Sequence, residues 1–101
     1  MTNNIKIKKE KLADFCQRYH IRKLSLFGSV LRKDFTPQSD IDVLVEFEAG
    51  HTPGLLRLAK MEQELSALLG GHKVDIRTPR DLSRYFRDEV ISSAQVQYAK
   101  R

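Results

Sequence analysis

Apolar and polar positions follow two different periods along this chain. Residues 8–19 repeat apolar side chains at helical spacing, which predicts an amphipathic helix. Its apolar face consists of Leu12, Phe15, Cys16 and Tyr19. Residues 41–47 instead alternate apolar and polar positions, which predicts a strand with one buried side. Shorter apolar runs at 22–27 and 73–77 predict two more strands.

A long helix is predicted in the second half of the chain. Thr52 is expected to be its N-cap, with Pro53 in the first turn, and Gly70 and Gly71 are expected to end it. We expect some of its leucines to be exposed at a partner surface if this chain lacks a helical companion domain. The predicted apolar face consists of Leu55, Leu58, Leu65, Leu68 and Leu69.

The order of the predicted elements defines the fold class. Residues 29–33 predict one helical turn and residues 79–93 a last helical region, whereas the tail from Ala94 shows no clear pattern. Helices and strands therefore alternate, which predicts an α/β (α+β) fold. We expect a single domain over residues 1–101, with a small mixed sheet of three or more strands flanked by helices.

Composition limits the class of protein. The chain has 101 residues, the usual size of one domain, and 41% of them are hydrophobic, which is enough for a packed core. Because Cys16 is the one cysteine, an internal disulfide and a cysteine-rich zinc site are excluded. No apolar run approaches the length of about 18 residues that a membrane helix needs. We therefore expect a soluble, cytoplasmic protein without membrane contact.

Positive charge is concentrated in the first third of the chain. Residues 1–33 hold nine Lys and Arg against two acidic residues, giving +7, and residues 34–101 hold nine against eleven, giving −2. A positive segment suits an anionic ligand such as a triphosphate, a nucleic acid or an acidic partner. It is equally typical of a solvated, lysine-rich helix.

Asp40 and Asp42 form the first part of a candidate active site. They stand at the start of the strand at 41–47, where alternate side chains share a face, so their Cα atoms are expected about 6–7 Å apart on one side. Aspartate is disfavoured in strands, and two on one face repel each other, which points to a functional reason. Paired carboxylates can bind Mg²⁺ together with substrate phosphates and water.

Asp75, Gly28 and Ser29 complete the predicted site. Asp75 interrupts the apolar strand at 73–77 and joins the other carboxylates if that strand lies beside 41–47. Three carboxylates suit two metal ions, about 3.5–4 Å apart, that clamp the attacking and leaving oxygens of a phosphoryl displacement. Asp75 is also a candidate to take the proton of the attacking hydroxyl. Gly28 lets the backbone approach a phosphate, and Ser29 offers a hydroxyl and an N–H.

These residues carry a resemblance to a known family. The chain resembles the DNA polymerase beta nucleotidyltransferase superfamily and, within it, the minimal nucleotidyltransferases that are the MNT partners in HEPN–MNT toxin–antitoxin pairs. The resemblance extends over about residues 8–93 and implies the nucleotidyltransferase fold without the second, helical domain of larger members. It rests on Phe27-Gly28-Ser29-Val30-Leu31-Arg32 and on Ser39-Asp40-Ile41-Asp42-Val43-Leu44-Val45.

The resemblance also implies an activity and a partner. Such proteins neutralise a HEPN ribonuclease toxin by binding it, and in some systems they transfer AMP from ATP to a tyrosine of the toxin. By this resemblance Gly28 and Ser29 bind the triphosphate. Asp40, Asp42 and Asp75 are the catalytic residues and ligands of Mg²⁺.

Two other functions stay open at this point. The chain could be a catalytically weak binding module that blocks the toxin stoichiometrically, which the absent second domain suggests. It could also transfer a nucleotide to RNA or to a small molecule. The positive first third of the chain permits a nucleic acid as partner without requiring one.

Several arginines admit both a functional and a structural interpretation. Arg32 follows the glycine-serine pair and suits either a nucleotide phosphate or a surface ion pair with Asp34. A second group is predicted to share one face of the last helix, where a partner protein, RNA or solvent would contact it. This group consists of Arg80, Arg84 and Arg87.

The remaining aromatic residues are given structural roles. Tyr85 and Phe86 are expected in the core rather than as a stacking platform. The histidines are too scattered along the chain to predict a metal site, and a lone histidine is commonly structural or exposed. These are His20, His51 and His72.

Overall fold

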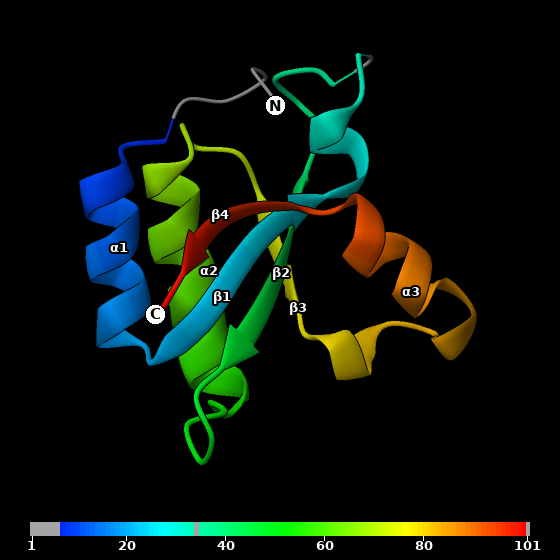
Figure 1. The fold of residues 1–101 in the computed structure, drawn as a ribbon. Helices are drawn as coiled ribbons and strands as arrows, with labels where there is room; N and C mark the ends of the chain where they lie inside the picture. Colours follow the sequence, from blue (N-terminus) through cyan, green and yellow to red (C-terminus); the bar gives the residue numbers. More distant parts are fainter. Residues whose placement is uncertain (1–6, 34, 101) are drawn as a thin grey trace.

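The computed structural model describes residues 7–33 and 35–100, in which helices and strands alternate (Figure 1). The α/β fold class is confirmed. The first helix and the three predicted strands each lie within one residue of their expected bounds. The elements are α1 (Lys9–Arg18), β1 (Ile21–Phe27), the 3-10 turn η1 (Gly28–Leu31), β2 (Ile41–Phe47), α2 (Leu55–Leu68), β3 (Val74–Arg77), the 3-10 turn η2 (Pro79–Asp81), α3 (Arg84–Ser93) and β4 (Gln95–Ala99).

The strands form one mixed sheet in the order β3-β2-β1-β4. β1 pairs antiparallel with both β2 and β4, whereas β2 and β3 run parallel. The parallel pair is joined through α2, as such crossovers usually are. β2 is therefore an interior strand, and a side chain on either of its faces has side chains of β1 and β3 beside it.

Helices α1 and α2 cover one face of the sheet (Figure 1). Ile41, Val43 and Val45 of β2 point into this face and are completely buried, as the alternating pattern predicts. The opposite face of β2 then carries the residues between them. The residues that α1, α2 and their C-caps bury in this core are Leu12, Phe15, Cys16, Tyr19, Met61, Leu65 and Leu69.

Helix α2 begins two residues later than predicted. Its N-cap is Gly54, which has an extended backbone (φ −76°, ψ 178°), so the prediction of Thr52 as N-cap is wrong. Glycine is accepted at an N-cap but costs about 1 kcal/mol inside a helix relative to alanine, which favours a start after it. The end of the helix agrees with the glycine pair: the Gly71 N–H donates to the Ser66 carbonyl at 2.8 Å.

The leucines of α2 do not all belong to the core. Leu58 packs partly against it, whereas Leu55 is 86% exposed and was wrongly assigned to the apolar face. Its neighbour Leu56 is 91% exposed. The expected exposure of some α2 leucines is thus confirmed at the start of the helix. At 14 residues α2 is longer than α1 and α3, and no helix in the described part of the chain could cross a membrane.

Residues 79–93 are not one continuous helix. Leu82 is extended, and the Ser83 hydroxyl accepts the N–H of the second residue of α3 at 3.3 Å. Serine is among the favoured N-cap residues, so the helix starts anew there. Because Arg80 lies in η2 and Arg84 opens α3, the predicted single helical face with Arg87 does not exist.

Helix α3 stands apart from α1 and α2, on the other side of the sheet in Figure 1, and none of its residues is buried. Tyr85 and Phe86 are 78% and 60% exposed, so their assignment to the core is wrong. After α3 the chain returns as β4, which pairs with β1. This strand lies in the tail for which the sequence pattern gave no prediction.

Candidate active site on the open face of the sheet

Asp42 lies at the centre of the candidate site. It is the second residue of β2, paired with Phe27 of β1 on one side and with Asp75 of β3 on the other. Residues paired in register share a face of the sheet, and this is the face away from α1 and α2, because Ile41 points toward the helices. The expected approach of the 73–77 strand to the two aspartates is therefore confirmed. Asp40 is exposed and precedes the strand by one residue.

Gly28 makes room for the Asp42 carboxylate. It directly follows β1 and has a φ of +75°, a conformation that side-chain-bearing residues rarely adopt. A Cβ atom at this position would lie 2.5 Å from Asp42 Oδ2 and would displace it. The glycine is therefore required by its own backbone and also by the carboxylate beside it.

Asp75 is held by an arginine of its own strand. Its Oδ2 accepts hydrogen bonds from Arg77 Nη2 at 2.9 Å and from Arg77 Nε at 3.2 Å. Residues two apart share a strand face, and that spacing was the signal in the sequence. The place of Arg77 beside the carboxylates was nevertheless not predicted.

The surroundings of Asp42 make its negative charge unfavourable. Burial, and after it the negative charge of Asp75, raises the pKa of Asp42 above its ordinary value. Asp40 adds to this rise, while Arg77 and Arg32 oppose it. A cation between these oxygens would relieve the repulsion, so the charge distribution suits a positively charged ligand.

The donor set fits Mg²⁺. Carboxylate oxygens are its preferred protein ligands, and it ordinarily takes only one or two of them, with substrate phosphates and water completing the shell. Among residues 7–33 and 35–100, no three His, Cys, Asp or Glu side chains stand close enough to hold a metal ion together. Phosphate oxygens would therefore have to supply part of the shell. The roles of Asp40, Asp42 and Asp75 as catalytic residues and ligands stay predictions.

Ser29 and Arg32 flank the turn after β1. The turn predicted at 29–33 is present as η1. Ser29 Oγ donates to the Asp40 carbonyl at 3.2 Å, which ties the turn to the residue before β2. Arg32 is exposed and follows η1 directly. Its predicted pair with Asp34 lies outside the described residues.

A cavity of about 500 Å³ opens between η1 and α3. It adjoins the candidate site because Gly28 and Phe27 belong to its wall. Leu31 and Arg32 complete that wall, and the opposite wall comes from α3. The α3 residues that line the cavity are Phe86, Glu89, Val90 and Ser93.

The histidines are not all scattered. His20 and His51, far apart in the sequence, stack with ring centroids 3.9 Å apart and an interplanar angle of 18°. His72 lies elsewhere, with its Nδ1 3.2 Å from the Ser39 carbonyl, next to Asp40. It thereby helps to hold the segment that leads into β2.

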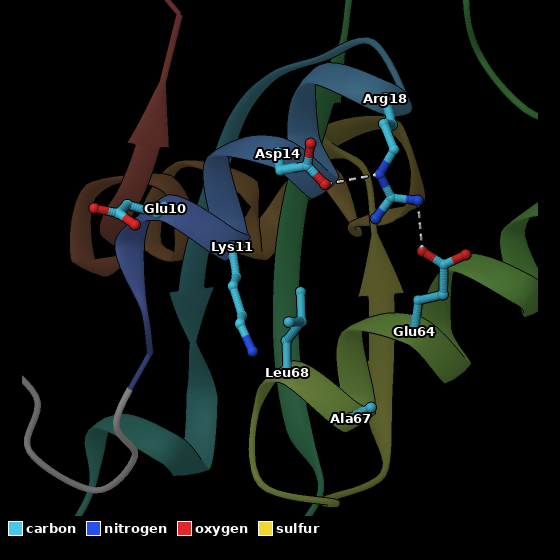
Figure 2. A pocket seen from close by; sticks show the side chains of 7 residues that line it. All are labelled: Glu10, Lys11, Asp14, Arg18, Glu64, Ala67 and Leu68. Carbon is cyan, nitrogen blue, oxygen red and sulfur yellow. Dashed lines mark hydrogen bonds and ion pairs between the residues drawn. The ribbon is translucent and has the colours of Figure 1, made fainter.

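A second hollow lies between α1 and α2, on the helical side of the molecule. Arg18 of α1 pairs with Asp14 of the same helix at 3.0 Å and with Glu64 of α2 at 3.2 Å. Figure 2 shows both contacts. Glu10 and Lys11 also line it, above the small apolar surface of α2. None of the predicted site residues belongs to this hollow, and its arginine is already paired with carboxylates.

Comparison with known proteins agrees with this geometry. The nucleotidyltransferase domain family matches residues 8–97 of the chain. A proposed protein adenylyltransferase of Methanocaldococcus jannaschii is 33% identical over 91 residues, which cover 90% of this chain and 95% of the relative. The match thus extends over both proteins almost completely.

Solved structures share the fold. A proposed minimal nucleotidyltransferase is 37% identical, with a TM-score of 0.68 and 85% of each chain covered. A chain from the complex of tri-AMPylated Shewanella oneidensis HEPN toxin with MNT antitoxin is 19% identical. It has a TM-score of 0.63, with 91% of this chain and 70% of that chain covered, and shows the shared fold alone. Because the family matches nearly the whole length of this chain, the chain belongs to the nucleotidyltransferase domain family.

Proposed function

We propose that this protein is a Mg²⁺-dependent nucleotidyltransferase antitoxin that transfers AMP from ATP to a tyrosine of a partner HEPN ribonuclease. The observation that carries the proposal is the register of β1, β2 and β3. It places the glycine turn beside Asp42, and Asp42 beside Asp75. Membership of the nucleotidyltransferase domain family supports the reaction class.

The chain's own residues bind and orient the nucleotide in this proposal. Gly28 and Ser29 bind the triphosphate, because the turn has no side chain at Gly28 to block a phosphate. Ser29 offers its backbone N–H and, once its hydroxyl turns from the Asp40 carbonyl, a second donor. Arg32 adds a positive charge at the end of the same turn. Asp40, Asp42 and Asp75 would be ligands of Mg²⁺, one or two carboxylates to an ion, with phosphate oxygens and water completing its shell. Mg²⁺ would neutralise the phosphate charge and stabilise the leaving pyrophosphate.

One bond forms and one breaks at the α-phosphorus of ATP in the proposed transfer. The acceptor hydroxyl oxygen forms a bond to the α-phosphorus of ATP, and the bond from that phosphorus to the oxygen bridging to the β-phosphate breaks. Pyrophosphate leaves, and Asp75 accepts the proton of the hydroxyl. The Arg77 guanidinium on Asp75 keeps that carboxylate oriented before the acceptor arrives.

The proposed partner follows from relatives of the chain. The Shewanella complex contains an AMPylated HEPN toxin and MNT antitoxin with this fold, and the M. jannaschii relative carries the name of a protein adenylyltransferase. The exposed leucines at the start of α2 offer apolar surface for a protein partner.

Intact mass spectrometry of the partner tests the acceptor. A purified candidate HEPN partner is incubated with ATP, Mg²⁺ and the wild-type protein, and peptide mapping then locates any adenylyl group. We expect whole adenylyl increments on tyrosine. An unmodified partner after complete incubation, or modification confined to other residue types, would contradict the proposal.

A binding module is the second candidate, and the absence of three clustered metal-binding side chains among the described residues favours it. Neutralisation of the toxin by the Asp40→Asn/Asp42→Asn variant separates the two functions. Full neutralisation by this variant, without modification of the toxin, indicates stoichiometric blocking. Loss of neutralisation by a folded variant indicates that transfer is needed.

A further inference from the structure

We propose that the cavity between η1 and α3 binds the adenosine part of the donor nucleotide, with Phe86 as the ring on which adenine stacks. The inference rests on the proposed function, because it takes the triphosphate to lie at Gly28. It assigns to α3 a role in nucleotide selection that the carboxylates on the sheet do not supply.

The cavity adjoins the turn at which we place the triphosphate. Gly28 belongs both to the predicted triphosphate turn and to the cavity wall, and Phe27 belongs to the wall and pairs with Asp42. The cavity therefore begins where the triphosphate would end. Its volume of about 500 Å³ lies within the usual range of small-molecule sites.

Both walls of the cavity carry apolar side chains. Leu31 and Phe27 present apolar surface on one side, and Phe86 and Val90 present it on the other. A flat base prefers such surroundings, and an aromatic ring binds it by stacking. Phe86 is 60% exposed on a helix that buries no residue, so it contributes little to the core and is available to a ligand.

Glu89 gives the cavity a preference among bases. Ser93 Oγ, the other polar group on this wall, already donates to the Glu89 carbonyl at 2.9 Å. In this assignment the Glu89 carboxylate faces position 6 of the purine and not the N1–H and 2-amino groups of guanine, from which it would also accept hydrogen bonds. At position 6 it matches the amino group of adenine and repels the carbonyl oxygen of guanine. We therefore expect ATP to be bound in preference to GTP.

Calorimetric titration of the whole protein with Mg²⁺ and a non-hydrolysable ATP analogue tests the inference. Phe86→Ala should raise the Kd about 5- to 100-fold, the usual effect of losing one base–aromatic stack, and Phe86→Tyr should restore it. Tyr85→Ala is the matched control. Tyr85 is an aromatic residue directly before Phe86, is 78% exposed and does not line the cavity. Glu89→Gln should reduce the preference over the GTP analogue about 10-fold.

Inorganic tripolyphosphate provides the probe without base or ribose. Its Kd should be the same for wild type and Phe86→Ala. An unchanged Kd for the ATP analogue in Phe86→Ala would overturn the assignment. An equal loss of affinity for the analogue in Tyr85→Ala, or an equal loss of affinity for tripolyphosphate in Phe86→Ala, would also overturn it. A wild type that binds the analogue through Phe86 but never modifies a partner would overturn only the proposed function. A wild type that modifies its partner with unaltered binding in Phe86→Ala would overturn only the inference.

Discussion

Asp42 of β2 and Asp75 of β3 are paired in register on parallel strands, so two carboxylates stand side by side on the open face of the sheet. Charges placed this way destabilise the fold unless a ligand uses them. Asp42 also lies beside Gly28 at the end of the neighbouring strand β1, and the missing side chain of this glycine leaves space for the carboxylate.

Replacing Gly28 should damage the site more than the fold. Gly28→Ala places a Cβ 2.5 Å from Asp42 Oδ2 and must displace that carboxylate. A displacement of about 1 Å in a catalytic group can lower the rate about 100-fold, and we expect a loss of this size in AMP transfer. Gly50→Ala is the control, since Gly50 has a similar φ of +79° with nothing within 4 Å. Both variants should lose about 1–2 kcal/mol of stability from the left-handed backbone. Equal transfer rates in the two would refute the close approach.

The leucines of α2 should divide into buried and exposed classes. Leu65 is completely buried, and Leu65→Ala should lower the free energy of unfolding by about 2–5 kcal/mol in urea titrations. Leu56 is 91% exposed, and Leu56→Ala should change it by no more than about 0.5 kcal/mol. A large loss of stability in Leu56→Ala would show that the start of α2 packs against the domain itself.

Glu64 should stabilise the protein in a pH-dependent way. It accepts a hydrogen bond from the Tyr19 hydroxyl at 2.7 Å and pairs with Arg18, and these contacts, the first above all, lower its pKa. A lowered carboxyl pKa stabilises the folded state above the ordinary glutamate value of 4.5 and loses this effect as the pH falls through the folded-state value.

Glu64→Gln should therefore cost about 1 kcal/mol at neutral pH, a modest figure because the side chain is partly exposed to water. The difference in melting temperature from wild type should shrink in acid. Asp14→Asn, which removes only the exposed partner of Arg18 on the same helix, should cost about 0.5 kcal/mol or less. A cost of Glu64→Gln that stays constant down to strongly acidic pH would disagree with the lowered pKa.

Cys16 should be unreactive in the folded protein. It belongs to α1 and points into the core, and burial raises the pKa of its thiol to about 12. At pH 8 both the low thiolate fraction and the lack of access should slow labelling by a disulfide reagent at least about 100-fold relative to the protein in denaturant. Rapid labelling under native conditions would mean that α1 detaches from the sheet.

Most of the fold could be predicted because its central elements have strong local patterns. Except at the buried Leu44, the strand at Ile41–Phe47 alternates buried and more exposed positions, so its inner face follows from the period. The strand at Gln95–Ala99 could not be predicted in the same way. It is short and lies at the edge of the sheet, where Val96 remains 50% exposed, and pairing with β1 rather than burial forms it.

The aspartates of the candidate site could be singled out from the sequence, whereas the helix that lies beside them could not. Spacing alone predicts Asp40 and Asp42 on one side of a strand. In the structure Asp40 precedes β2 by one residue, and the parallel pairing with β3 brings Asp75 beside Asp42. The contact of Arg77 with Asp75 follows from the same spacing once it is applied to β3. The exposure of Phe86 depends on how α3 is placed relative to the sheet, which no local pattern encodes.

The most direct test of the central claim is transfer of labelled AMP from ATP to the purified HEPN partner in the presence of Mg²⁺. Wild type is compared with Asp40→Asn/Asp42→Asn, and with Asp88→Asn as an exposed aspartate of α3 outside the site. The account predicts label on the partner with wild type and Asp88→Asn, and none with the folded double variant. Undiminished labelling by the double variant would contradict it, as would no labelling by wild type while the toxin is still neutralised.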